Sequence, residues 1–370
     1  MSVTMTTRAA DQPTPIVPRA VWIDRLRASL ILLVILHHAA ITYGASGSWI
    51  YKATEATNVP LTFLAAVNQA FFMGLFFMIS GALAPVSLER KGAAAFLGDR
   101  AIRLGVPVLV FGLVLGPLTV ALASAPIGEI LADTAARILR GSFILGPLWF
   151  PAALLVFSVV FAVWPAHGVV ARAVPPFARW LGLAFATGLA ALLIRQVVPV
   201  GATVAGFQLG YFASYIVLFI VGVQAGRYGW LDRLPRRSLW LAMTVGLVAL
   251  PILPVVLLAT NAPRFETGFS SAAIVYAVWE PLVALGAIAA LIVWSQRRGN
   301  RAAAFWARAA ANSYGAFILH APILVTVSRA MDTIGTPHAA ALPLSVFATT
   351  LVAFGLTAVL RRSAFVRRVV

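Results

Sequence analysis

Cysteine is absent from the 370-residue sequence, and charged residues are scarce. Without cysteine the chain has no disulfide, no thiolate metal site and no cysteine nucleophile. Only 11% of the residues are charged and 61% are hydrophobic, with a mean hydropathy of +0.94, whereas soluble domains have about 25% charged residues. No loop is long enough for a separate soluble domain. This composition predicts a polytopic membrane protein whose core is the helix bundle itself.

Lysine is also nearly absent, so the net charge of +17 comes from arginine. A strongly positive net charge is a feature of proteins that bind nucleic acid. The arginines lie in short turns between apolar segments, however, so we expect membrane lipid around the protein and no nucleic acid. Residues 1–18 have no long apolar run and are predicted to be a disordered cytoplasmic tail, not a cleaved signal peptide. The chain shows no zinc triad, nucleotide-binding glycine loop or G-x-S-x-G motif.

Ten apolar segments can cross a bilayer, which takes about 20 helical residues. They are 22–44, 60–84, 101–124, 146–165, 177–197, 210–227, 238–259, 272–295, 313–330 and 341–360. Alternate connections are rich in Lys and Arg, with 22 of these residues on one side and 6 on the other. The positive-inside rule therefore predicts an all-α bundle of ten transmembrane helices with both termini in the cytoplasm. A single transmembrane domain is expected at 19–362, followed by a cytoplasmic tail at 363–370.

The first span has a charged start, including Asp24, Arg25 and Arg27, and contains His37 and His38 well inside its apolar run. Arg27 and His38 are eleven positions apart, which at about 100° per residue places both on one face. At about 1.5 Å per residue they are roughly 16 Å apart along the axis. A histidine at this depth needs a partner or a polar cavity. Two interpretations stay open: a functional face, or a snorkelling arginine with histidines bonded to neighbouring helices.

Two further positions are candidates on physical grounds. Glu280 is the only acidic residue well inside a span; it either pairs with a cation on another helix or orients a catalytic imidazole. Arg100 and Arg103 share a helix face at the predicted start of the third span. Such a pair suits a phosphate-bearing ligand, because guanidinium binds phosphate oxygens in a bidentate way. The alternative is that the positive charges of Arg100 and Arg103 only set the orientation of the chain in the membrane.

Four short motifs, in this order, resemble those of the acyltransferase-3 family of membrane proteins. They are R-x10-H at Arg27 and His38, F-F-x-x-S-G at Phe76–Gly81 with Ser80, R-x-x-R-x-x-x-P at Arg100, Arg103 and Pro107, and S-Y-x-x-Y-x-x-H at Ser313–His320. Phe317 replaces the usual tyrosine of the last motif, which puts any role of that hydroxyl in doubt. The resemblance covers almost the whole chain.

The resemblance implies an enzyme of the bacterial inner membrane that transfers an acyl group, with acetyl expected first, from acyl-coenzyme A. The implied acceptor is a hydroxyl of a carbohydrate or a lipid-linked molecule, and some runs look closest to members that modify membrane glucans. A buried imidazole has the pKa range that a general base needs, so His38 is expected to be the base or a transient acyl carrier. The catalytic candidates are His38, Arg27 and Glu280; Arg100 and Arg103 are expected to bind the donor; His320, Ser80 and His37 are further candidates. No bound cofactor and no metal are expected.

Two other classes of function would use similar residues. A transporter of an anionic or lipid-linked solute would also need arginine and histidine inside the bundle, although no inverted repeat is visible. A non-catalytic membrane scaffold is the third possibility. Transfer of an acyl group by the purified protein would separate the enzyme from both.

Overall fold

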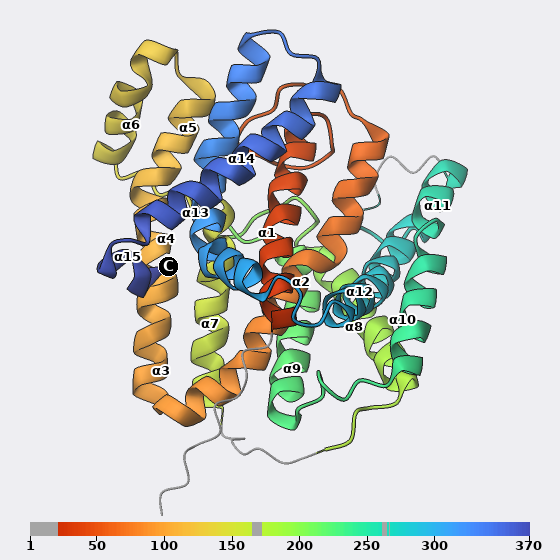
Figure 1. Cartoon of the computed structure of the whole chain (residues 1–370). Coiled ribbons are helices and arrows are strands. Elements are labelled where there is room, and N and C mark those ends of the chain that lie inside the picture. The colour runs from red at the N-terminus through yellow and green to blue at the C-terminus, as the bar shows by residue number, and fades with distance from the viewer. Residues whose placement is uncertain (1–20, 165–171, 261–264, 266) are drawn as a thin grey trace, which may run out of the picture.

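The computed structural model describes residues 21–164, 172–260, 265 and 267–370 (Figure 1). In these ranges the regular elements are helices, and one isolated bridge joins Val204 to Phe207. Ten of the helices, counted over the described residues, are long and apolar enough to cross a membrane. This confirms the predicted all-α polytopic bundle. The predicted tail at 1–18, and Arg264 in a predicted outer connection, lie outside the described residues.

The ten spans follow one another along the chain. They are α1 (Val21–Thr42), α2 (Val59–Lys91), a third span from α3 (Ala93–Arg100) through η1 (Ala101–Gly105), α4 (Val106–Val110) and η2 (Phe111–Leu115) to α5 (Gly116–Ser124), η4–α7 (Gly146–Leu148 and Trp149–Val163), α8 (Phe177–Val197), η5–α9 (Leu209–Tyr211 and Phe212–Tyr228), α10–α11 (Arg236–Ala249 and Ile252–Thr260), α12 (Ser271–Arg297), α13 (Ala303–Thr333) and α14 (His338–Leu360). Three short helices lie between or after them: η3 (Ile127–Glu129), α6 (Ile130–Leu139) and α15 (Ala364–Val369).

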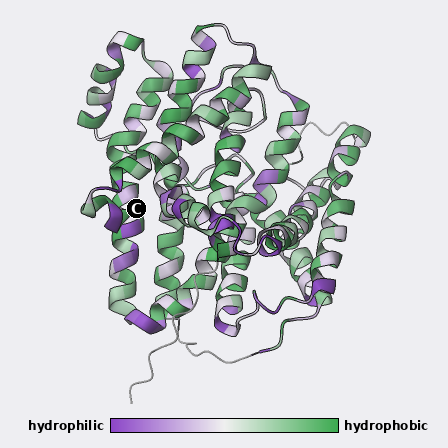
Figure 2. Ribbon diagram, viewed as in Figure 1, coloured by the Kyte–Doolittle hydropathy of each residue, from purple (hydrophilic) through white to green (hydrophobic). Residues whose placement is uncertain are grey.

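Hydrophobic residues make up most of the helices, and hydrophilic residues lie mainly at helix ends and in connections (Figure 2). Helices α8, α10–α11 and α14 are the least buried spans. Their exposed residues include many large apolar side chains, such as Leu189, Leu247 and Phe347. An apolar outer surface of this kind is stable in lipid, where it need not be covered by other protein.

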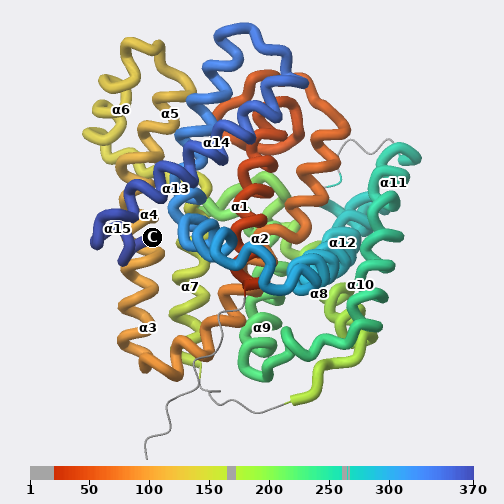
Figure 3. Tube along the Cα trace, in the orientation of Figure 1, coloured from red at the N-terminus to blue at the C-terminus, as the bar shows by residue number. Residues whose placement is uncertain are grey.

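Helix α1 is the centre of the bundle and packs against α2, α12, α13 and α14 (Figure 3). Its start is held by Arg25, which is fully buried. The Arg25 guanidinium donates to the carbonyls of Ser295, Gly299 (3.2 Å) and Arg301 (3.1 Å) and lies over the Trp306 ring. A cation is favourable at the carbonyl end of a helix, so Arg25 fixes α1 to the end of α12 and the start of α13.

Helices α2 and α9 approach each other most closely. A Cβ atom on Gly222 would lie 2.0 Å from the Met78 carbonyl oxygen, and one on Gly226 would lie 2.0 Å from that of Ala82. Only glycine fits where two helix backbones come this near. The backbone contact of α2 with α9 therefore depends on these two glycines.

The third span is a continuous helix with two π-helical turns, η1 and η2. Each comes just before a proline, Pro107 in α4 or Pro117 in α5. Proline has no N–H to donate and crowds the preceding turn, and a wider turn relieves that strain. Arg103 lies in η1.

Four boundaries differ clearly from the predicted ones. The second span ends at Lys91 instead of 84. The third span begins at Ala93 instead of 101, so Arg100 and Arg103 lie inside a helix and not at its start. The ninth span begins at Ala303 and not near residue 312, because Ser313 is buried and donates back to the Ala309 carbonyl, as a serine inside a helix does. Residues 363–370, expected to be a tail, contain helix α15.

A buried ion pair joins α8 to α12. The Arg195 guanidinium donates to the Glu280 carboxylate and, through Nε, to the Gly210 carbonyl at 3.0 Å. Both side chains are almost fully buried, and the Tyr276 ring lies 4.7 Å from the Arg195 guanidinium carbon. Two roles were predicted for Glu280, pairing with a cation on another helix or orienting a catalytic imidazole. The structure shows the first of them.

We expect loss of one partner of this pair to destabilise the protein strongly. Glu280→Leu leaves the Arg195 charge buried and unpaired, which costs about 3–5 kcal/mol when a buried pair is broken. The double variant Arg195→Leu/Glu280→Leu should recover most of the thermal stability in detergent. If the double variant is stable and active, Glu280 serves the fold; if it is stable and inactive, the predicted catalytic role of Glu280 gains support. A Glu280→Leu protein as stable as the wild type would contradict the pairing.

The side of the membrane on which the termini lie is a separate prediction. The chain has no cysteine, so one introduced cysteine reports without background. Ser48 and Ser363 are exposed on connections that the charge split assigns to opposite sides. In intact bacterial cells Ser48→Cys should react with an impermeant maleimide and Ser363→Cys should react only after lysis. The reverse pattern would mean that the termini face outward.

Candidate active site

The structure brings together two histidines that are 282 residues apart in the chain. Nδ1 of His38, on α1, lies 3.1 Å from Nε2 of His320, on α13, and the two rings are stacked. His320 is fully buried, and His38 is half-buried. Nδ1 of His320 lies 2.5 Å from the Phe317 carbonyl oxygen. Each ring is thus held by a specific polar contact inside an apolar bundle.

These contacts select one tautomer of each neutral ring. A carbonyl oxygen only accepts, so Nδ1 of His320 carries its proton and Nε2 does not. Nε2 of His320 must then accept, and His38 donates from Nδ1. Nε2 of His38 is left with a free lone pair, which is the form of imidazole that can take a proton from a substrate. The backbone of Phe317 makes the contact to His320, so the missing tyrosine hydroxyl at this position is not needed for it.

Trp49 completes the surroundings of His38, although sequence analysis did not select it. The indole ring, in the connection between α1 and α2, stacks on His38 with ring centres 3.8 Å apart. Its Nε1 atom is buried and has no hydrogen-bond partner among the described residues. A π-face against an imidazole stabilises the protonated form of that ring. Trp49 therefore adds both a stacking surface and an unused N–H donor.

His37 has a different environment from His38. Its ring is buried and packs against Phe72 of α2 at 4.9 Å. This is the neighbouring-helix packing expected for a residue about 100° away from His38 around the helix. His37 therefore contributes to the packing of α1 on α2.

The remaining candidates lie on α1, α2 and α12, and the contacts that hold the histidine pair do not include them. Arg27 is half-buried on α1, eleven residues before His38, and Ser80 is half-buried on α2. Glu280 is bonded to Arg195. Catalytic roles for these three residues stay predictions. The described residues also contain no group of three or more His, Asp or Glu side chains that could hold a metal ion.

The predicted donor-binding arginines lie on the third span, with different surroundings. The Arg100 guanidinium is half-buried and lies over the Phe96 ring at 5.1 Å. Arg103 is exposed in η1. The adjacent Asp99 carboxylate is bonded to Lys91. Arg103 is thus the member of the pair that is open to a ligand.

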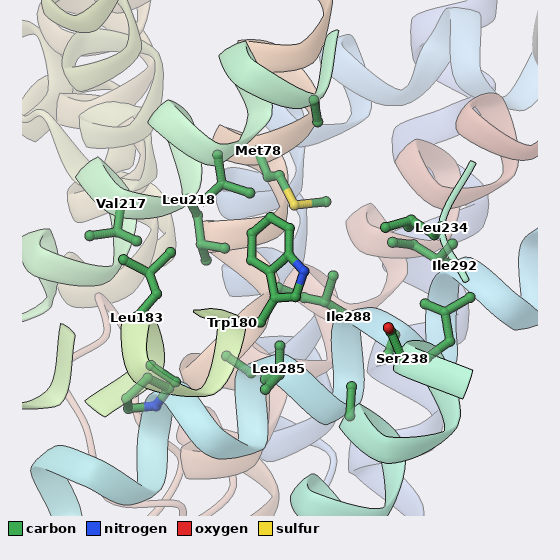
Figure 4. A pocket seen from close by; sticks show the side chains of 18 of the residues that line it. Met78, Trp180, Leu183, Val217, Leu218, Leu234, Ser238, Leu285, Ile288 and Ile292 are labelled. Atoms are coloured by element: carbon green, nitrogen blue, oxygen red, sulfur yellow. The ribbon is translucent and has the colours of Figure 1, made fainter. Parts of the chain in front are cut away.

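An apolar pocket of about 150 Å³ lies away from these residues, among α8, α9, α10 and α12 (Figure 4). Trp180, Leu218 and Ile288 are among its lining residues, and no predicted site residue is. Its tryptophan and threonine donors are already bonded to backbone carbonyls: Trp180 to Pro175, Trp230 to Arg172, and Thr187 to Leu183. Ser214 and Ser238 also line the pocket, but no His, Asp, Glu, Lys or Arg side chain does. The candidate site is therefore placed at the histidine pair.

Sequence reasoning missed two partners of the candidate residues, for different reasons. Trp49 follows the first span by seven residues, and no periodicity links a loop residue to a helix face. Arg195 was counted among the charges of an outer connection, although it is the cation that Glu280 requires. The lone deep carboxylate was the usable signal, because a buried carboxylate needs a cation on some helix.

Comparison with known proteins identifies the family of the chain. The model of one protein family, described as an acyltransferase domain, matches residues 20–362. No curated protein and no solved structure matches the chain. The match includes the helices that carry His38, Ser80, Arg100, Arg103, Glu280 and His320. The chain is therefore a multi-pass membrane acyltransferase and belongs to the acyltransferase-3 family.

Proposed function

We propose that the protein transfers an acyl group, with acetyl as the first candidate, from acyl-coenzyme A to a hydroxyl group of a carbohydrate or lipid-linked acceptor. The observation that carries this proposal is the His38–His320 contact of 3.1 Å, with His320 bonded in turn to the Phe317 carbonyl. It leaves a proton acceptor on the half-buried His38. A hydroxyl acceptor needs such a base in order to attack an acyl carbonyl. The family membership supports the acyl transfer.

His38 acts as the general base and His320 as its positioning residue. When Nε2 of His38 takes the acceptor proton, the charge on the imidazolium is shared with Nδ1–H, which donates to His320. A hydrogen bond from a charged donor is stronger than one from a neutral donor, so the contact strengthens as the reaction proceeds. The stacked Trp49 ring stabilises the same charge. Both effects favour the transition state over the resting site.

The indole N–H of Trp49 is the proposed donor that stabilises the acyl oxygen. A buried donor without a partner costs about 1–3 kcal/mol, and a bound carbonyl oxygen removes that cost. Acyl transfer places negative charge on this oxygen, where a preorganised N–H is most effective. We assign this role to Trp49 because its ring stacks directly on the base.

Arg103 is the proposed contact for the phosphate groups of the donor, with Arg100 beside it. Arg103 is exposed, while Arg100 is partly engaged with Phe96. The predicted topology puts both on the cytoplasmic side, where coenzyme A occurs. The protein is proposed to act in the bacterial inner membrane, and glycan modification is the proposed pathway class.

The first test of this mechanism substitutes the histidines of the site one at a time. His38→Ala and His38→Gln should both lower transfer by about 10²–10⁴-fold, the usual contribution of a general base. His320→Leu should lower kcat less and move the acid limb of the pH–rate profile, because His38 loses its acceptor. His37→Ala is the matched control and should be milder. The assay is transfer of labelled acyl groups from acyl-coenzyme A in membranes with equal amounts of each protein. Full product from His38→Ala would remove His38 from the mechanism.

Trp49 can be tested by separating its N–H from its ring. Trp49→Phe keeps an aromatic ring against His38 and removes the donor, so kcat should fall on the order of 10²-fold, as for one oxyanion donor, while the pH limb stays in place. Trp49→Leu removes both features and should also move the pH limb. The measurement is the pH dependence of kcat and KM for the three proteins. A Trp49→Phe enzyme with wild-type kcat would rule out the donor role.

A further inference from the structure

The C-terminal helix α15 is fixed against the third span. It packs on η1, the segment that carries Arg103, and Figure 1 shows it beside the α3–α4 segment. Val369 is buried, and the Arg361 guanidinium donates to the Val370 carbonyl. The Val370 side chain reaches α13, where a Cβ atom on Gly315 would lie 2.8 Å from it. The end of the chain is therefore part of the bundle.

This docking brings arginines of three segments into one area. They are Arg103 of η1, Arg361 after α14, and Arg367 and Arg368 of α15. Burial, and then the nearby charges of Arg103 and Arg367, lower the pKa of Arg361 below its usual value. Arg103 and Arg368 both act on the carboxylate of Asp99. Arg361 thus lies within electrostatic reach of Arg103 and Arg367, and Arg368 lies within reach of the same carboxylate as Arg103.

Three of these four positive charges, those of Arg103, Arg367 and Arg368, have no ion-pair partner in the described part of the chain. Asp99, the carboxylate on which they act, is already bonded to Lys91. Arg361 is bonded to the backbone oxygen of Val370, the last residue of the sequence. Like charges gathered in one area raise the free energy of the folded state, and a bound anion lowers it again. Membrane topology explains basic residues on one side, but it does not require those of three separate segments to converge.

We propose that α15 completes a binding site for a phosphate-bearing ligand, in which Arg361, Arg367 and Arg368 act together with Arg103. Guanidinium groups from several directions suit a ligand with more than one phosphate group, because each can bind phosphate oxygens in a bidentate way. The assignment of that ligand as the donor, coenzyme A with its diphosphate and 3′-phosphate, rests on the proposed function. The headgroup of an anionic phospholipid offers the same chemistry and is the other source.

The experiment measures binding, so it does not depend on turnover. The test variant is Arg367→Ala/Arg368→Ala in the full-length protein. Both side chains are exposed, whereas Arg361 is bonded to Val370 and holds α15 in place. Arg367→Lys/Arg368→Lys keeps the charge. The matched control is Arg236→Ala/Arg237→Ala, two exposed residues at the start of α10, on the other side of the bundle (Figure 1). The probes are coenzyme A and 3′-dephospho-coenzyme A, titrated at two salt concentrations.

The Ala variant should weaken coenzyme A binding by about tenfold and reduce its salt dependence, since two screened charges are lost. The Lys variant should recover part of the affinity, and the control should bind like the wild type. The preference for coenzyme A over 3′-dephospho-coenzyme A should shrink in the Ala variant alone. Thermal stabilisation by phosphatidylglycerol is measured in parallel. If that stabilisation is lost while coenzyme A affinity is kept, the site holds and its ligand is the lipid headgroup. Unchanged affinity and unchanged lipid stabilisation would overturn the proposal. Failure of the proposed function has a different signature, namely no acyl product from the wild type with any donor.

Discussion

A polar side chain buried inside a membrane bundle has no water to bond with, so it must find its partners on other helices. Three contacts of this kind hold the structure together. Arg25 fixes α1 to the carbonyl end of α12, Arg195 fixes α8 to Glu280 of α12, and His38 fixes α1 to His320 of α13. The first two contacts place the helices, and the third becomes chemistry once the helices are placed. The candidate site thus follows from the same requirement as the fold.

The spans themselves could be predicted from the sequence, because each depends on a local property, an apolar run bounded by charges. All ten appear in the described structure. The predicted helix boundaries were wrong where a polar residue was interpreted as a helix end without regard to its contacts. Ser313 looked like a helix start, but its hydroxyl bonds back into the helix. The run before Arg100 looked like a loop, yet the helix begins at Ala93. The π-helical turns before Pro107 and Pro117 left no sequence signal beyond the prolines themselves.

The site could be predicted only in part, for a related reason. One helix carries both Arg27 and His38, so their spacing is visible in the sequence. The contact between His38 and His320 depends on how α1 packs on α13, and the stacking of Trp49 depends on the path of a loop. Resemblance to a family supplied His320 as a candidate. It could not predict the bond of His320 to the Phe317 carbonyl or the resulting tautomer of His38. The convergence of α15 with Arg103 was likewise invisible, because residues 363–370 carried only a charge pattern.

The glycine contact between α2 and α9 has a mechanical consequence. At Gly222 and Gly226 the two backbones touch with no side chain between them, so neither helix can slide or tilt without the other. The pair therefore moves as a single rigid body that spans the membrane. Any motion that admits or releases a ligand must take place between this body and the rest of the bundle. Helix α1 packs against α2 and also against α13, so it connects the glycine-packed pair to the helix that carries His320.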